Sequence, residues 1–141
     1  MSFISKLVRS FARRRLQARL RRAFEQHREE LHRNYFLVAS STGLPRGLTW
    51  KGCDWLPGFV MLREQSTGEI SRLSAVNLTF EAIEGGDMEN VKAVSTVREA
   101  CAVFQWDGRR WVPTGRTLFN MDPTAAAHRF GNGYEMLQAG N

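Results

Sequence analysis

The segment before Gly43 contains neither glycine nor proline, and this feature constrains the fold of the 141-residue chain more than any other. Arginine, leucine, alanine, glutamine and glutamate are abundant in it, and all five are good helix formers. We therefore expect a helical segment over 1–36, ~50 Å long if it were straight. From Gly43 onward, short apolar runs alternate with turn residues, a pattern that is typical of strands.

The apolar residues of the helical segment fall on two different faces. The first set lies within 1–11 and shares one face: Phe3, Ile4, Leu7, Val8 and Phe11. The second set begins at Ala12 and continues to Tyr35. At about 100° per residue, the two stripes face nearly opposite ways. We therefore expect a break or kink near 11–13, between a short amphipathic segment and a basic helix over 12–36 that packs on the body.

Positive charge is concentrated in the same segment. The chain has 20 Lys and Arg residues against 14 Asp and Glu residues, a formal net charge of +6. Residues 1–35 carry a net charge of +7, and residues 36–141 carry −1. Eight basic side chains precede the first acid, Glu25: Lys6, Arg9, Arg13, Arg14, Arg15, Arg19, Arg21 and Arg22. We predict that these eight side chains bind an anionic partner.

Residues 37–141 are expected to form an antiparallel sheet, in a single domain with the helix over 12–36. Short apolar runs at Leu48–Cys53 and Phe59–Glu64 each predict a strand. The stretch Ala100–Phe104 is apolar on both faces, which predicts a strand inside the sheet. The expected fold is α+β, with the long basic helix on a curved four- to five-stranded antiparallel meander and a short C-terminal helix. This element order is similar to that of cystatin-like and nuclear-transport-factor-like cones.

Local signals in the last third of the chain predict a turn and the ends of elements. Asp107-Gly108 is typical of a two-residue type I′ hairpin loop, which would place Phe104 opposite Trp111. Asp122-Pro123 predicts the start of the short C-terminal helix, because the aspartate can cap it and proline suits its first position. The polar tail from Asn132 is expected to fray.

The sequence contains no motif for catalysis or cofactor binding. His27 and His32 lie five residues apart, on different helix faces, which excludes the metalloprotease spacing. Cys53 and Cys101 fall in predicted strands, where a buried, unreactive thiol is expected. Phosphate-binding loops, dinucleotide fingerprints and paired Cys-x-x-Cys zinc patterns do not occur. We therefore expect an interaction domain rather than an enzyme, with no metal and no cofactor.

Several partners are compatible with the basic segment. An anionic membrane surface would bind the apolar face of 3–11 together with the surrounding basic residues. Nucleic acid would bind the arginines through its phosphates. Another protein subunit could cover the apolar face. We favour the membrane interface by a small margin, because phosphate contacts alone do not need an apolar face. An organellar targeting segment that is later removed is a further alternative.

Composition also bears on the compartment. No apolar run approaches the roughly 18–20 residues of a transmembrane helix. The two cysteines are too few for a disulfide-stapled scaffold, which favours a reducing compartment. We therefore expect a cytoplasmic protein, with peripheral membrane attachment.

Two further surfaces are candidate binding sites. The expected hairpin tip interleaves aromatic and basic residues, a mixture that stacks bases and holds phosphates: Trp106, Arg109, Arg110 and Trp111. A cone-shaped sheet could also enclose an apolar pocket between helix and sheet, as in a small-ligand-binding or enzymatic domain. The residues expected to line that pocket are all aromatic: Trp50, Phe59, Phe80 and Phe104.

Overall fold

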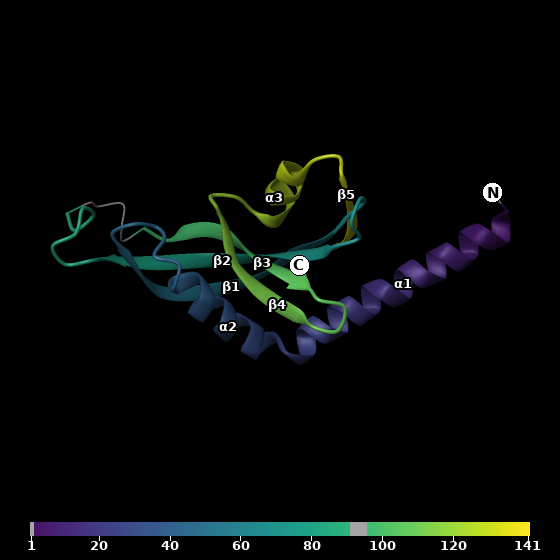
Figure 1. Ribbon diagram of the computed structural model, residues 1–141, viewed down its shortest axis with the longest axis horizontal. Coiled ribbons are helices and arrows are strands. Elements are labelled where there is room, and N and C mark those ends of the chain that lie inside the picture. The colour runs from purple at the N-terminus through teal and green to yellow at the C-terminus, as the bar shows by residue number, and fades with distance from the viewer. Residues whose placement is uncertain (1, 91–95) are drawn as a thin grey trace.

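The computed structural model describes residues 2–90 and 96–141, and within them the chain forms an α+β fold around a five-stranded antiparallel sheet of order β4-β3-β2-β1-β5 (Figure 1). A long helix leads at the N-terminus, and a short helix precedes the last strand, as Figure 1 shows. In chain order the elements are α1 (Phe3–Gln26), α2 (Arg28–Ser40), β1 (Leu48–Glu64), β2 (Ile70–Ala82), β3 (Arg98–Trp106), β4 (Trp111–Phe119), α3 (Pro123–Phe130) and β5 (Tyr134–Gly140).

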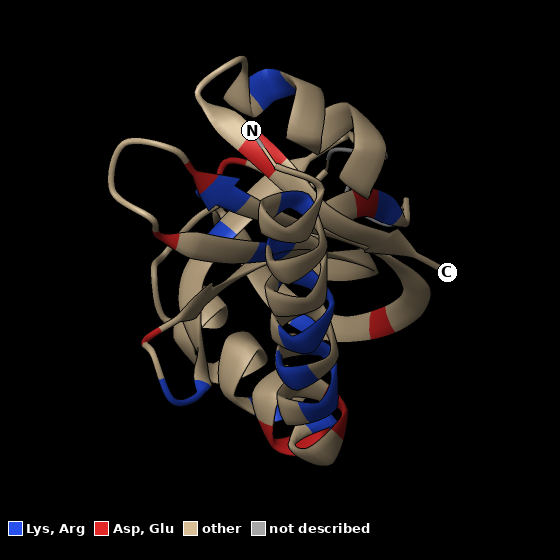
Figure 2. Ribbon diagram, turned by 90° about the vertical axis from the view of Figure 1, so that its right-hand side faces the viewer, with Lys and Arg blue, Asp and Glu red and all other residues tan. Residues whose placement is uncertain are grey.

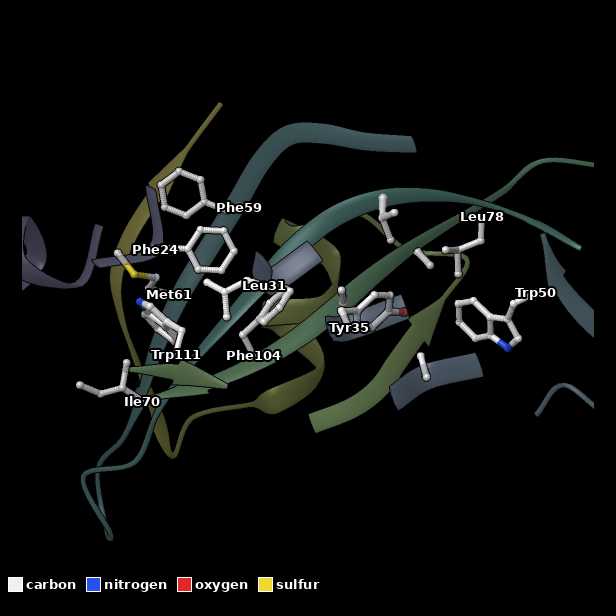
Figure 3. Packing of buried hydrophobic residues seen from close by; sticks show 14 of the residues in the cluster. Phe24, Leu31, Tyr35, Trp50, Phe59, Met61, Ile70, Leu78, Phe104 and Trp111 are labelled. Atoms are coloured by element: carbon white, nitrogen blue, oxygen red, sulfur yellow. The ribbon is translucent and has the colours of Figure 1, made fainter. Parts of the chain in front are cut away.

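Helices cover both faces of the sheet, so the domain has three layers. The end of α1 and the whole of α2 cover one face, where Phe24 and Tyr35 pack against Phe104 of β3 (Figure 3). The helix α3 covers the other face through Ala126, in a smaller cluster that includes Leu73 of β2. The strands β2 and β3 lie inside the sheet and are buried on both faces, as the apolar stretch Ala100–Phe104 predicts.

The two strands expected at Leu48–Cys53 and Phe59–Glu64 are parts of the single strand β1. Its pairing with β2 shifts register between Trp50 and Gly52, and again between Trp55 and Phe59. The second shift contains Pro57, which has no backbone N–H to give to a sheet ladder and is therefore tolerated at an irregular point. The bulges bend β1 without ending it.

The helix α1 is continuous through residues 11–13, so the expected break at that point is wrong. The break lies at His27, whose φ and ψ angles of −122° and 19° separate α1 from α2. Two opposed apolar stripes would require a break only if both packed on the same body. In the structure only the second stripe does, and the first part of α1 projects beyond the sheet (Figure 1).

The hairpin between β3 and β4 has a four-residue loop, Asp107–Arg110, and not the expected two-residue loop. Trp106 therefore pairs with Trp111, and Phe104 pairs with Pro113. A type I′ turn needs positive φ at both central residues, and only Gly108 of the loop has it. The Oδ1 atom of Asp107 instead closes the loop by accepting from the backbone N–H groups of Arg109 and Arg110, each at 2.8 Å.

The C-terminal tail is ordered, contrary to the expectation that it frays from Asn132. Residues Tyr134–Gly140 form β5, which pairs with the β1 segment Phe59–Glu64 at the edge of the sheet. The short helix α3 precedes it and begins as predicted, because the Asp122 side chain accepts a hydrogen bond from the Ala125 N–H at 2.8 Å. The edge of β1 supplies the backbone partners that a polar tail lacks by itself.

Candidate functional site

The N-terminal arm, residues 3–12, has no buried side chain. Phe3 and Ile4 are 76% and 72% exposed, and Phe11 is still 65% exposed. Monomeric proteins rarely leave a contiguous apolar stripe of this kind in water, and such a stripe marks an interaction site. Figure 1 shows the arm extending away from the sheet.

The second half of α1 is held on the body by buried and hydrogen-bonded residues. Leu20 and Phe24 are fully buried, and the Nε1 atom of Trp111 donates to the Leu20 carbonyl at 2.9 Å. Arg13 forms an ion pair with Glu135 and donates to the Met136 carbonyl at 2.7 Å. These contacts fix the direction in which the arm projects.

A spacing of eleven residues relates the apolar arm to the arginines that follow it. Phe3, Ile4, Val8 and Phe11 are followed eleven positions later by Arg14, Arg15, Arg19 and Arg22. Eleven residues are about three helical turns, so each pair lies on the same side of a continuous helix. The side opposite to these pairs carries Leu20 and Phe24. The outer face of α1 is therefore apolar near the N-terminus and basic further along.

The structure divides the eight predicted anion-binding residues into two groups. Arg13 is paired with Glu135, and the Arg19 guanidinium lies 5.6 Å from the centre of the Trp106 ring. The other six are exposed and have no ion pair with any residue in the described ranges: Lys6, Arg9, Arg14, Arg15, Arg21 and Arg22. Figure 2 shows the basic residues along α1, with acidic residues only near its junction with α2.

At the hairpin tip the two tryptophans are packed, whereas the two arginines are exposed. Trp111 is buried beneath α1, and Trp106 packs on it edge to face at 5.4 Å between ring centres. The two tryptophans therefore have a structural role, which is to hold α1 on the sheet. Arg109 and Arg110 are exposed and border an open hollow of about 490 Å³ beside α2.

The four aromatic residues expected to line an apolar pocket are packed within the core instead. Trp50, Phe59, Phe80 and Phe104 are all buried, and the rings of Trp50 and Phe80 touch edge to face at 5.0 Å. Figure 3 shows Phe59 and Phe104 among the other buried side chains of this cluster. The space between helix and sheet that these rings occupy is therefore filled.

The thiols of Cys53 and Cys101 and the imidazole of His32 are partly or fully buried, and all three are uncharged at neutral pH. Burial raises the pKa of both Cys53 and Cys101 to about 12, so they stay protonated. Burial also lowers the pKa of His32 to about 4, and its ring stacks on Trp55 at 3.8 Å. Within residues 2–90 and 96–141, no group of three or more His, Cys, Asp or Glu side chains is placed to hold a metal ion.

Arg72 of β2 was not among the residues predicted from the sequence, although it is the one buried charged residue in the described part of the chain. Its position in the strand gives a weak indication that this arginine is buried. Arg72 lies in the same phase of β2 as Ile70 and Val76, which face the core beneath the helices. A charge in an apolar phase costs free energy unless something neutralises it.

Comparison with known protein families, with curated proteins and with solved structures gives no match. Among the helices of the described residues, none is both long enough and apolar enough to cross a membrane.

Proposed function

We propose that the protein is an interaction domain that docks on an anionic membrane surface through the outer face of α1. One observation carries the proposal: an exposed apolar stripe over residues 3–11 continues, on the same side of one helix, into arginines that have no ion pair with any described residue. Helices with this division of apolar and basic residues bind in the plane of the lipid headgroups. In this arrangement the apolar arm enters the interface, while Arg14, Arg15 and Arg22 contact lipid phosphates.

The free energies of these contacts are those of a reversible attachment to the membrane. Each basic residue near an anionic leaflet contributes ~1 kcal/mol, and six such residues on α1 have no ion pair within the described ranges. Each large apolar side chain that leaves water completely contributes ~1.5–3 kcal/mol, and the five of the arm are 45–76% exposed. The body would remain outside the bilayer, since α1 is anchored on it by the face opposite to the lipid.

Nucleic acid is the competing partner for the same arginines. Phosphate contacts would use Arg14, Arg15 and Arg22 equally well. They would leave the side chains of Phe3, Ile4 and the rest of the arm in water, so they do not account for the apolar half of the face. The membrane proposal accounts for both halves.

Vesicle co-sedimentation with matched variants tests the proposal. The apolar variant carries Phe3→Ser, Leu7→Ser and Phe11→Ser, which keeps every charge. The basic variant carries Arg14→Gln and Arg15→Gln, which keeps the apolar arm. Each is compared with the unchanged protein on phosphatidylserine-containing vesicles, on phosphatidylcholine vesicles and on a short DNA duplex.

Membrane docking predicts that the apolar variant loses about 100-fold in affinity for anionic vesicles, equivalent to ~2.7 kcal/mol. The basic variant should also bind them more weakly, and neither should bind phosphatidylcholine alone. If the apolar variant sediments with anionic vesicles as well as the unchanged protein does, the proposal is wrong. Tight DNA binding with a steep salt dependence, unaffected by the serine substitutions, would identify the nucleic-acid alternative instead.

A further inference from the structure

A second hollow, of about 270 Å³, lies where the α1–α2 junction meets β1 and β2. Three arginines from three different elements line it: Arg21 of α1, Arg28 of α2 and Arg72 of β2. Glu25 is the one acidic side chain among its lining residues, and Glu25 forms an ion pair with Arg28. With His32 neutral, the side chains of the lining therefore carry a net charge of +2.

Arg72 at the inner wall of this hollow is in contact with two aromatic rings and a hydroxyl group. Its guanidinium lies between the rings of Phe24 and Phe59, 3.7 Å and 4.0 Å from their centres; both rings are labelled in Figure 3. Its Nε donates to the Ser74 hydroxyl at 3.0 Å. The two rings and the hydroxyl fix the plane of the guanidinium without neutralising its charge.

No carboxylate within the described ranges forms an ion pair with Arg72, although the residue is only 5% exposed. Its Nη1 atom is buried and has no hydrogen-bond partner among the described residues. Burial lowers the pKa of Arg72 to about 9, and the charges of Arg28 and Arg21 add to this lowering, while Glu25 opposes it. The group is still charged at neutral pH, so a buried positive charge faces a positively charged hollow.

The geometry points to a binding site for a small phosphate-bearing ligand in this hollow. Guanidinium groups bind oxyanions through paired N–H donors, and here three arginines from three different elements line one hollow. A phosphate ester carries a charge of about −1.5 to −2 at pH 7 and three acceptor oxygens. It therefore matches both the charge and the number of arginines, whereas a carboxylate has one charge and two oxygens. The volume suits a phosphate group with a small substituent rather than a nucleotide or a polymer.

This site shares Arg21 with the membrane-docking face, because Arg21 follows Phe3 by about five helical turns on the same side of α1. It differs from that face in depending on Arg28 of α2 and on Arg72 of β2. Nitrogen–proton NMR of the full chain provides the test. Inorganic phosphate is titrated at constant ionic strength, with chloride and acetate as controls, and the Nε–H resonances of Arg72 and the indole N–H of Trp55 are followed. Glycerol 3-phosphate and a short-chain phosphatidic acid, titrated in the same way, distinguish a soluble ester from a lipid headgroup.

Three variants make the result specific. Arg72→Met removes the buried charge and should abolish the phosphate-dependent shift at Trp55. Arg21→Gln should weaken phosphate binding about tenfold, the loss of roughly one charge-assisted hydrogen bond. Arg22→Gln is its matched control, because Arg22 is the next residue on the same helix and does not line the hollow. It should change phosphate affinity by less than about twofold.

Two results would overturn the assignment. The first is a phosphate response at Trp55 and Arg72 no larger than the response to acetate or chloride. The second is an equal loss of affinity in the Arg21→Gln and Arg22→Gln variants, which would show diffuse attraction to α1 rather than a site. This pair decides the question even if Arg72→Met does not fold. Both variants should weaken vesicle binding similarly, so failure of one proposal is distinguishable from failure of the other.

Discussion

Replacement of Arg72 by methionine should stabilise the protein. Methionine is unbranched and of similar length, so it can occupy the slot between Phe24 and Phe59 without a large cavity. The substitution removes a charge that is 95% buried and has no ion pair within the described ranges. Buried charges are often worth less to stability than apolar side chains of the same volume.

The magnitude follows from the contacts of Arg72. The lowering of its pKa from the usual 12.5 to about 9 corresponds to a cost of ~5 kcal/mol for the charged form in the folded state. Burial of the three methylene groups of the stem offsets ~2 kcal/mol of this cost. Contacts of the flat group with the two rings and with Ser74 that do not depend on its charge offset ~2 kcal/mol more. The arginine is therefore close to neutral in its effect. An apolar side chain of this size contributes ~2 kcal/mol on burial, so Arg72→Met should raise the free energy of unfolding by about 1 to 2 kcal/mol.

The pH dependence of this difference identifies its cause. Between about pH 9 and 12, the unfolded chain keeps the Arg72 proton and the folded protein releases it, so the stability of the unchanged protein rises with pH relative to the variant. The advantage of methionine should therefore shrink by ~1.4 kcal/mol for each pH unit above 9. Titration of Cys53, Cys101 and Tyr35, whose pKa values burial raises, is common to both proteins and cancels in the difference.

Urea unfolding, followed by tryptophan fluorescence at pH 7.5 and at pH 10, measures the effect. Arg63→Met is the control, because Arg63 lies on the neighbouring strand and is paired with Glu135 at 3.0 Å; it should lose up to about 1 kcal/mol. If Arg72→Met is less stable than the unchanged protein by more than ~1 kcal/mol, or if its advantage is the same at both pH values, the buried charge is not what limits stability at this position.

Three further predictions concern the core, a histidine and a helix cap. Phe24→Ala should lower the free energy of unfolding by ~3–5 kcal/mol, because Phe24 is fully buried; Phe3→Ala, at an exposed position, should change it by less than ~0.5 kcal/mol, and equal losses would contradict the packing of α1. The NMR titration midpoint of His32 should lie near pH 4. The free energy of unfolding should fall as pH decreases from 6.5, because the unfolded chain takes up this proton first. A midpoint above 6 would exclude the burial of His32. Asp122→Ala should lower the urea midpoint by the equivalent of ~1 kcal/mol and Asp122→Asn should restore most of it, since the side-chain oxygen caps α3; no difference between the two would rule out the cap.

Local signals were sufficient for some elements and insufficient for others. The absence of glycine and proline before Gly43 predicted the helical segment, and Asp122-Pro123 predicted the start of α3, because both depend on backbone preferences within a few residues. The position of the break at His27 and the loop of the Asp107–Arg110 hairpin were missed. Each depends on packing or on a side-chain hydrogen bond that competes with the local preference.

The strand β5 shows why the rest of the fold could not be read locally. Its partners are the edge of β1 and the side chains of Arg13 and Gln17 on α1, which bind the carbonyls of Met136 and Leu137. These contacts join the two ends of the chain. A polar tail becomes ordered when it finds such partners, and its own composition does not indicate that they exist.

The sequence alone determined that this protein has a basic N-terminal helical segment, with no acid before Glu25, and a nearly neutral sheet domain, because charge and helix propensity are properties of local composition. Tertiary structure decided how that charge is used. It paired Arg13 with Glu135, placed Arg19 on Trp106, and left six basic residues on α1 without an ion pair in the described ranges. It also buried Arg72 between two aromatic rings under the helices, since only the assembled sheet brings β1, β2 and α1 together around one guanidinium.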